Sequence, residues 1–148
     1  MASPLEVVYM PPANPSPQVQ RVLRWAETFS SFERNVGAHF ADDVEYHVLP
    51  RALQRPVVTR RRACEEGFER QRSLFNFVIH DLVESGSMIS VHVSSYGTGA
   101  NGTLYTNEYF FTFYFRPGGQ WEDGLPKIAV VHEFVDSLST ERRAAGGT

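Results

Sequence analysis

The stretch LYTNEYFFTFYF, residues 104–115, is rich in aromatic residues and threonine and predicts a long β-strand. Side chains alternate across a strand, so the stretch has two faces of different composition. The more apolar face is assigned to the core or to a cavity, and it carries Asn107, Tyr109, Phe111, Phe113 and Phe115. The other face still holds Phe110 and Tyr114, and monomers rarely expose broad apolar patches. We therefore expect a second copy of the chain to cover this face in a homodimer.

Alternating patterns continue on both sides of this strand. They predict strands over residues 75–83 and 88–96, joined by a tight turn, and a last strand over residues 127–136. An earlier strand is expected from DDVEYHVLP, residues 42–50, in which Tyr46 shares a face with Val44 and Val48. Most of these strands follow one another through short turns, so a mainly antiparallel sheet is expected.

Helical spacing dominates the N-terminal part of the chain. Ser16 is an N-cap and Pro17 suits the first helical position, which predicts an amphipathic helix over residues 17–30. Further helices are expected over residues 31–41 and about 60–74. Helices that precede a mainly antiparallel sheet indicate an α+β fold. The sheet must curl over the helices, which leaves a conical cavity with Trp25 and Phe29 at its floor.

The chain of 148 residues suits a single domain. Residues 1–16 contain four of the nine prolines and predict a flexible arm that adds an edge strand or packs on a partner. Residues 17–138 form the expected domain. Residues 139–148 are expected to be a disordered polar tail.

Composition narrows the function classes. The net charge of −3 offers no basic excess for nucleic acid, and no apolar stretch approaches the roughly 20 residues of a membrane span. Cys64 is the one cysteine, so no intrachain disulfide can form, which fits a reducing compartment. We expect a cytoplasmic protein without a cofactor. His39 and His47 lack a third ligand at regular spacing, so zinc is not expected.

The last strand, KIAVVHEFVD at residues 127–136, carries three ionisable groups among apolar residues. Its bulkier face, assigned inward, consists of Ile128, Val130, His132, Phe134 and Asp136. By the same alternation Glu133 is expected to face outward. His132 and Asp136 then lie about 13 Å apart and cannot bond to each other.

Asp136 and His132 are the candidate catalytic residues. Asp136 would act as a general acid or base in a desolvated pocket, or would simply cap the turn that follows the strand. His132 would serve as a general base or oxyanion donor, or as a satisfied core histidine. The candidate substrate-binding residues are Tyr46, Trp25, Phe29, Asn107, Tyr109, Phe111 and Phe134.

Several motifs resemble one family. FADDVEYHVLP at residues 40–50, YGTG at 96–99 and the pattern GLPKI…EFVDS at 124–137 look like the NTF2-like superfamily. They are most similar to its SnoaL-like branch, including SnoaL-like chains common in fungi. The resemblance spans about residues 17–138.

The resemblance implies a cone-shaped α+β barrel, often dimeric, with a small-molecule pocket. Such proteins include polyketide cyclases, ketosteroid isomerases, scytalone dehydratases, limonene-epoxide hydrolases and isomerases of fungal meroterpenoids. They use acid/base chemistry without a cofactor. In the polyketide cyclases the acid/base aspartate lies eight residues after the isoleucine of a GKI motif, which corresponds here to Asp136. Val48, Leu49 and Phe111 stand near the positions of the ketosteroid isomerase carboxyls, so that reaction is not implied.

Two hypotheses follow from the sequence. The first is an acid/base enzyme of cyclase, isomerase or dehydratase type, which acts on an apolar oxygenated small molecule in secondary metabolism. The second is a non-catalytic ligand-binding or dimerisation module on the same scaffold, because a fold does not determine a function.

Overall fold

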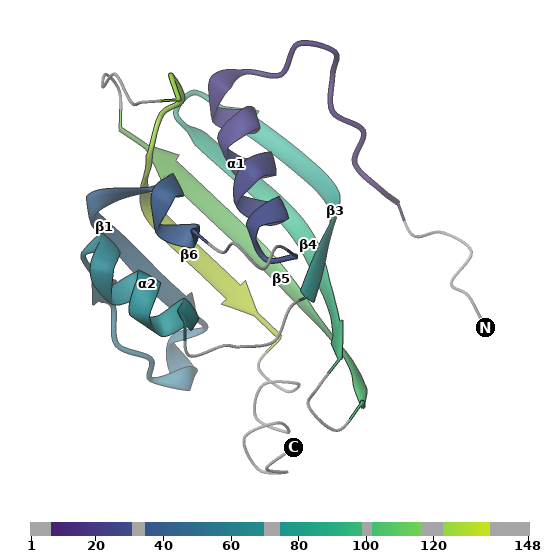
Figure 1. The fold of residues 1–148 in the computed structure, drawn as a ribbon, viewed down its shortest axis with the longest axis vertical. Coiled ribbons are helices and arrows are strands. Elements are labelled where there is room, and N and C mark those ends of the chain that lie inside the picture. Colours follow the sequence, from purple (N-terminus) through teal and green to yellow (C-terminus); the bar gives the residue numbers. More distant parts are fainter. Residues whose placement is uncertain (1–6, 31–34, 70–74, 99–101, 117–122, 137–148) are drawn as a thin grey trace.

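The structure, a computed structural model, describes residues 7–30, 35–69, 75–98, 102–116 and 123–136. Six strands form one mixed, curved sheet in the order β2-β1-β6-β5-β4-β3 (Figure 1). They are β1 (Phe40–Leu49), β2 (Val58–Thr59), β3 (Phe75–Ser85), β4 (Met88–Thr98), β5 (Leu104–Phe115) and β6 (Ile128–Val135). The β1–β6 pair is parallel, and the other pairs are antiparallel. The predicted α+β class is confirmed.

Two helices, α1 (Pro17–Thr28) and α2 (Arg61–Glu69), lie on the same face of the sheet. As predicted, α1 begins at Pro17, and the Ser16 hydroxyl accepts a hydrogen bond from the Val19 N–H. The expected helix over 31–41 is wrong where the structure describes it. A short 3₁₀ helix, η1 (Val36–His39), gives way to β1 at Phe40, because fully buried Phe40 pairs with Ile128 of β6. Residues 31–34 and 70–74 of the expected helices lie outside the described ranges.

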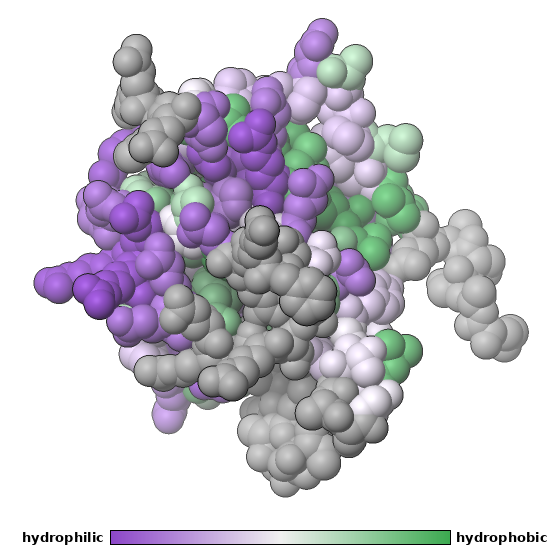
Figure 2. All heavy atoms as spheres, in the orientation of Figure 1, coloured by the Kyte–Doolittle hydropathy of each residue, from purple (hydrophilic) through white to green (hydrophobic). Residues whose placement is uncertain are grey.

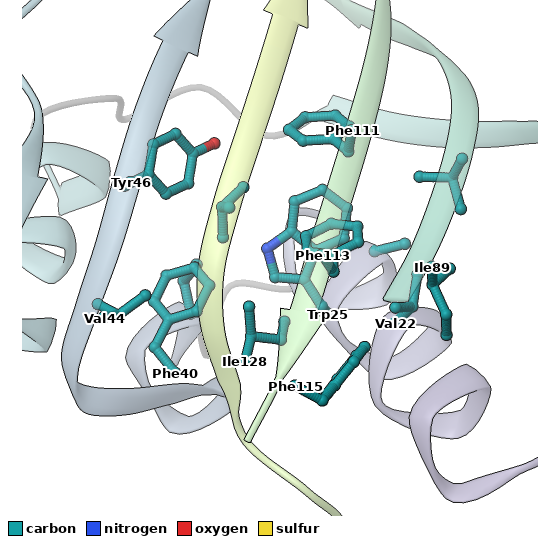
Figure 3. Packing of buried hydrophobic residues seen from close by; sticks show 14 of the residues in the cluster. Val22, Trp25, Phe40, Val44, Tyr46, Ile89, Phe111, Phe113, Phe115 and Ile128 are labelled. Atoms are coloured by element: carbon teal, nitrogen blue, oxygen red, sulfur yellow. The ribbon is translucent and has the colours of Figure 1, made fainter. Parts of the chain in front are cut away.

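The core lies between α1 and the sheet. Trp25 of α1 contacts Phe77, Phe111 and Phe113 of the sheet, with ring centroids 4.9–5.3 Å apart. Figure 3 shows Trp25 beside Phe113, with Phe111, Val22 and Ile128 nearby. Burial of such a side chain contributes about 1.5–3 kcal/mol, so this cluster is the main support of the helix on the sheet.

A buried arginine holds the segment that leads into β6. Arg21 donates hydrogen bonds to the Pro126 and Leu125 carbonyls and pairs with Asp123 at 2.8 Å. Its Nη1 donates to His39 Nδ1 at 3.1 Å. Burial, followed by the charge of Arg21, lowers the pKa of His39 to about 4. A neutral His39 is therefore the acceptor that Arg21 requires.

The N-terminal segment runs beside β3, at one edge of the sheet. The Tyr9 N–H donates to the Ile79 carbonyl at 2.8 Å, and the Ser16 hydroxyl donates to Glu84 at 2.6 Å. Hydrophobic side chains gather over β3 and this segment in the space-filling view (Figure 2). The predicted tail at 139–148 lies beyond the described part and stays a prediction. Neither α1 nor α2 is long and apolar enough to cross a membrane.

Candidate functional site

A cavity of about 540 Å³ opens between α2 and strands β1, β5 and β6. The connection between β1 and α2, which includes η2 (Arg51–Leu53) and β2, lines its side. A volume of this size is typical of small-molecule sites. Most of the lining is apolar, and the polar lining side chains are Tyr46, Arg55, Cys64, Asn107, Tyr109 and Glu133.

The two wall strands β1 and β6 bring Tyr46 and Glu133 together. Tyr46 pairs with Val131 in the parallel β1–β6 register, which makes Glu133 its diagonal neighbour on the same face. The Tyr46 hydroxyl points toward β6 (Figure 3) and donates to Glu133 Oε1 at 2.5 Å. This is the short distance expected for a charge-assisted O–H···O⁻ bond.

The surroundings raise the pKa values of both Tyr46 and Glu133. Burial raises the pKa of Glu133, while the hydrogen bond from Tyr46 and the charge of Arg55 oppose that rise. Burial and the adjacent Glu133 carboxylate raise the pKa of Tyr46 well above its usual value. Tyr46 therefore keeps its proton and remains a hydrogen-bond donor. The raised pKa of Glu133 means that this carboxyl changes its protonation closer to neutral pH than a free glutamate does.

Two further polar side chains face the same cavity from β5. Asn107 is buried, and its Oδ1 accepts from the Glu108 N–H at 2.9 Å. This bond fixes the amide and leaves its Nδ2 hydrogens to be donated. Tyr109 accepts a hydrogen bond from the Ser95 hydroxyl at 3.4 Å. A carbonyl oxygen in the cavity would find a donor at Asn107.

Cys64 lines the cavity but does not have the properties of a nucleophile. Burial, and then the charge of Glu65, raise the pKa of its thiol to about 11. Because the thiolate is the reactive form, Cys64 is a packing residue at neutral pH.

The predicted orientation of the last strand is wrong beyond Ile128. Phe115 pairs with Ile128 but Tyr114 pairs with Val130, so Ala129 is an extra residue in β6. This β-bulge reverses the alternation. Val131 and Val135 are buried, and Glu133 lines the cavity.

The two predicted catalytic residues consequently lie outside the cavity lining. His132 is on the outer face, where its ring contacts His47 and Tyr114 with centroids 5.0 and 5.3 Å apart. Asp136 is exposed just after β6, and its backbone N–H donates to the Glu108 carbonyl at 3.1 Å. The structure brings neither residue together with Tyr46, and Glu133 is the cavity carboxyl instead.

The predicted substrate-binding residues divide into three groups. Tyr46, Asn107 and Tyr109 line the cavity as expected. Trp25, Phe29 and Phe111 are buried in the core and are not part of this lining. Phe134 is 50% exposed and points away from it, for the same reason as His132.

Sequence reasoning missed Glu133 and Arg55. The signal for Glu133 was present, since a carboxylate within a valine-rich strand is unusual, but the bulge that turns it inward has no clear sequence mark. Arg55 follows η2 in a short irregular segment without periodicity, so no pattern indicated its direction.

Solved structures with the same architecture are numerous. BvnE pinacolase from Penicillium brevicompactum has a TM-score of 0.71 at 23% identity, over 87% of this chain and 92% of that chain. TerC, co-crystallised with polyporic acid, has a TM-score of 0.67 at 15% identity, over 86% and 97%. A protein of Jannaschia sp. CCS1, described as a SnoaL-like polyketide cyclase, has 0.67 at 12% identity, over 85% and 90%. No protein-family model matches the sequence, and no curated protein matches it.

Proposed function

Since the chain has the NTF2-like fold of SnoaL-like proteins, we propose that it is a cofactor-independent acid/base enzyme acting on an apolar, oxygenated small molecule. The observation that carries this proposal is the hydrogen-bonded pair of Tyr46 and Glu133 in the wall of a 540 Å³ cavity. Secondary metabolism is the proposed setting, because a pinacolase and a protein described as a polyketide cyclase share the fold.

Glu133 is the proposed proton carrier. Tyr46 holds Oε1, which leaves Oε2 for the substrate. In the ionised form Glu133 would remove a proton from a carbon next to a carbonyl, and the electron pair would move to the carbonyl oxygen. Asn107 would donate a hydrogen bond to that oxygen as it becomes negative.

The resulting enolate has three outcomes within reach of this site. Return of the proton from Glu133 to a different carbon gives isomerisation. Attack of the enolate carbon on a second carbonyl, whose oxygen takes the proton from Glu133, gives cyclisation. Expulsion of a β-hydroxyl, which leaves as water with the same proton, gives dehydration. A carboxyl with a raised pKa suits both the removal and the return of the proton.

Deuterium exchange tests this proposal without knowledge of the natural substrate. Apolar 1,3-diketones in D₂O would be incubated with the protein, and exchange at the central carbon would be followed by NMR. Glu133→Gln should slow exchange by about 10²–10⁴-fold. Asp136→Asn should leave it close to the wild-type rate.

The comparison of these two variants decides between the carboxyls. If Asp136→Asn abolishes exchange and Glu133→Gln does not, Asp136, the residue indicated by the family resemblance, is the acid/base group and Glu133 is not. A wild-type protein that exchanges none of the diketones but binds polyporic acid would favour the alternative, a non-catalytic binding module.

We further propose that the outer face of the sheet forms a homodimer. Phe110 and Phe134 are cross-strand partners on β5 and β6 and are 55% and 50% exposed. Two adjacent exposed aromatic rings form an apolar patch of the kind that is covered by a partner. Light scattering at micromolar concentration should show a dimer that Phe110→Asp converts to monomer, and a wild-type monomer would remove this proposal.

A further inference from the structure

We propose that Arg55 recognises an anionic oxygen group on the substrate, such as a carboxylate or an ionised enol. This inference rests on the acid/base function proposed above and narrows its substrate class. Arg55 would be a specificity-determining residue, which orients the substrate while Glu133 moves the proton.

The position of Arg55 is at the rim of the cavity. It lies between η2 and β2, is exposed to solvent, and contributes to the lining. Arg55 is the basic residue of the lining and Glu133 is its carboxyl, whereas Tyr46 and Cys64 hold their protons. The cavity therefore has one positive group near its opening and one carboxyl in its wall.

Among the residues that the structure describes, Arg55 lacks the carboxylate partner that several exposed arginines have. Arg61 pairs with Asp42 at 3.2 Å, and Arg116 forms a bidentate pair with Asp43 at 2.9 and 3.0 Å. Within the described ranges, no carboxylate lies within ion-pair distance of Arg55, Glu133 included. The planar guanidinium thus keeps its fork of N–H donors available to an incoming acceptor.

Arg55 and Glu133 line the same cavity, and the positive charge of Arg55 opposes the rise that burial causes in the pKa of Glu133. A substrate that places an anionic oxygen at Arg55 can therefore reach Glu133 with another part of its skeleton. The same arrangement disfavours the reverse orientation, because an anionic oxygen beside ionised Glu133 would be repelled.

A matched pair of ligands tests this inference by calorimetry. The probes are 2-naphthoate and 2-naphthamide, which share a ring system and differ in charge. Wild-type protein should bind the carboxylate more tightly than the amide. Arg55→Gln should weaken binding of 2-naphthoate about tenfold, as expected for loss of a charge-assisted contact, and should leave the amide unchanged.

Arg51→Gln is the control, because it removes the same charge from the same connection outside the cavity lining. It should leave the binding of both probes unchanged. Equal affinity of wild-type protein for the two probes, absence of carboxylate binding, or equal weakening by both variants would overturn the inference.

The two proposals fail in different experiments. Glu133→Gln should still bind 2-naphthoate, since Arg55 supplies the recognition, although it loses deuterium exchange. Exchange that survives in Glu133→Gln would refute the acid/base function. If Arg55→Gln still binds 2-naphthoate while deuterium exchange still depends on Glu133, only the proposal that Arg55 recognises an anionic group would be refuted.

Discussion

Removal of the Tyr46 hydroxyl is the most direct test of the Tyr46–Glu133 pair. Tyr46→Phe deletes the donor of the 2.5 Å bond and keeps the ring. That ring is 5% exposed and packs against Phe68 and Phe40, with centroids 5.9 and 6.2 Å away. The packing contribution should therefore survive, and the change isolates the hydrogen bond.

The cost of this change should depend on pH. At pH 9, where more of Glu133 is ionised, the loss of a hydrogen bond to a charged group should lower the free energy of unfolding by up to about 1.5–3 kcal/mol. At pH 4.5 the protonated form is favoured, because burial raises the pKa of this carboxyl above its ordinary value. The loss should then fall to about 0.5–1.5 kcal/mol, the value for neutral groups.

Urea unfolding of wild-type and Tyr46→Phe protein at the two pH values measures this difference. Other groups that titrate between them, His39 included, affect both proteins and cancel in the comparison. Tyr114→Phe is the control, since Tyr114 lies half-buried on the outer face and should lose little at either pH. An equal loss at pH 4.5 and pH 9 for Tyr46→Phe would refute the view that this hydroxyl stabilises the ionised form of Glu133.

Three further predictions follow from the same contacts. Burial raises the pKa of Glu133, so the contribution of this residue to stability falls as pH rises from 4.5 through the raised pKa. In urea unfolding, Glu133→Gln should therefore gain stability relative to wild type between pH 4.5 and pH 9. A constant difference between the two proteins would contradict this. Arg21→Met should lower the free energy of unfolding by about 3–5 kcal/mol in thermal unfolding, because it breaks a buried network. Arg24 is 52% exposed and 3.7 Å from the same Asp123, so Arg24→Met should lower it by at most about 1 kcal/mol. Similar losses in the two variants would argue against the network. Cys64, with its pKa raised to about 11, should react with iodoacetamide at pH 8 about a hundredfold more slowly in the native protein than in urea, and equal rates would show an accessible thiolate.

Much of the fold was present in the sequence as periodicity. The change from helical to alternating spacing after residue 74 marks the part of the chain that forms β3 to β6, and it follows from the different geometries of helix and strand. The alternation of residues 104–115 correctly assigned Asn107 and Tyr109 to the cavity face, because β5 is regular over that part. Tyr46 was also assigned correctly, since the alternation of β1 holds from Val44 onward.

Periodicity did not reveal which carboxyl of the last strand lines the cavity. Alternation carried forward from Ile128 turns His132 inward, and a single extra residue at Ala129 reverses that result. A β-bulge depends on how two strands pair, and the side chains of one strand do not reveal it.

The sequence by itself therefore determined most of the helices and strands and which face of each regular strand is buried, because both follow from local geometry and side-chain polarity. The tertiary structure alone decided that Glu133 meets Tyr46 and that Arg55 reaches the same cavity. Those contacts depend on the parallel β1–β6 register and on an irregular connection, and both are set by packing between segments far apart in the chain.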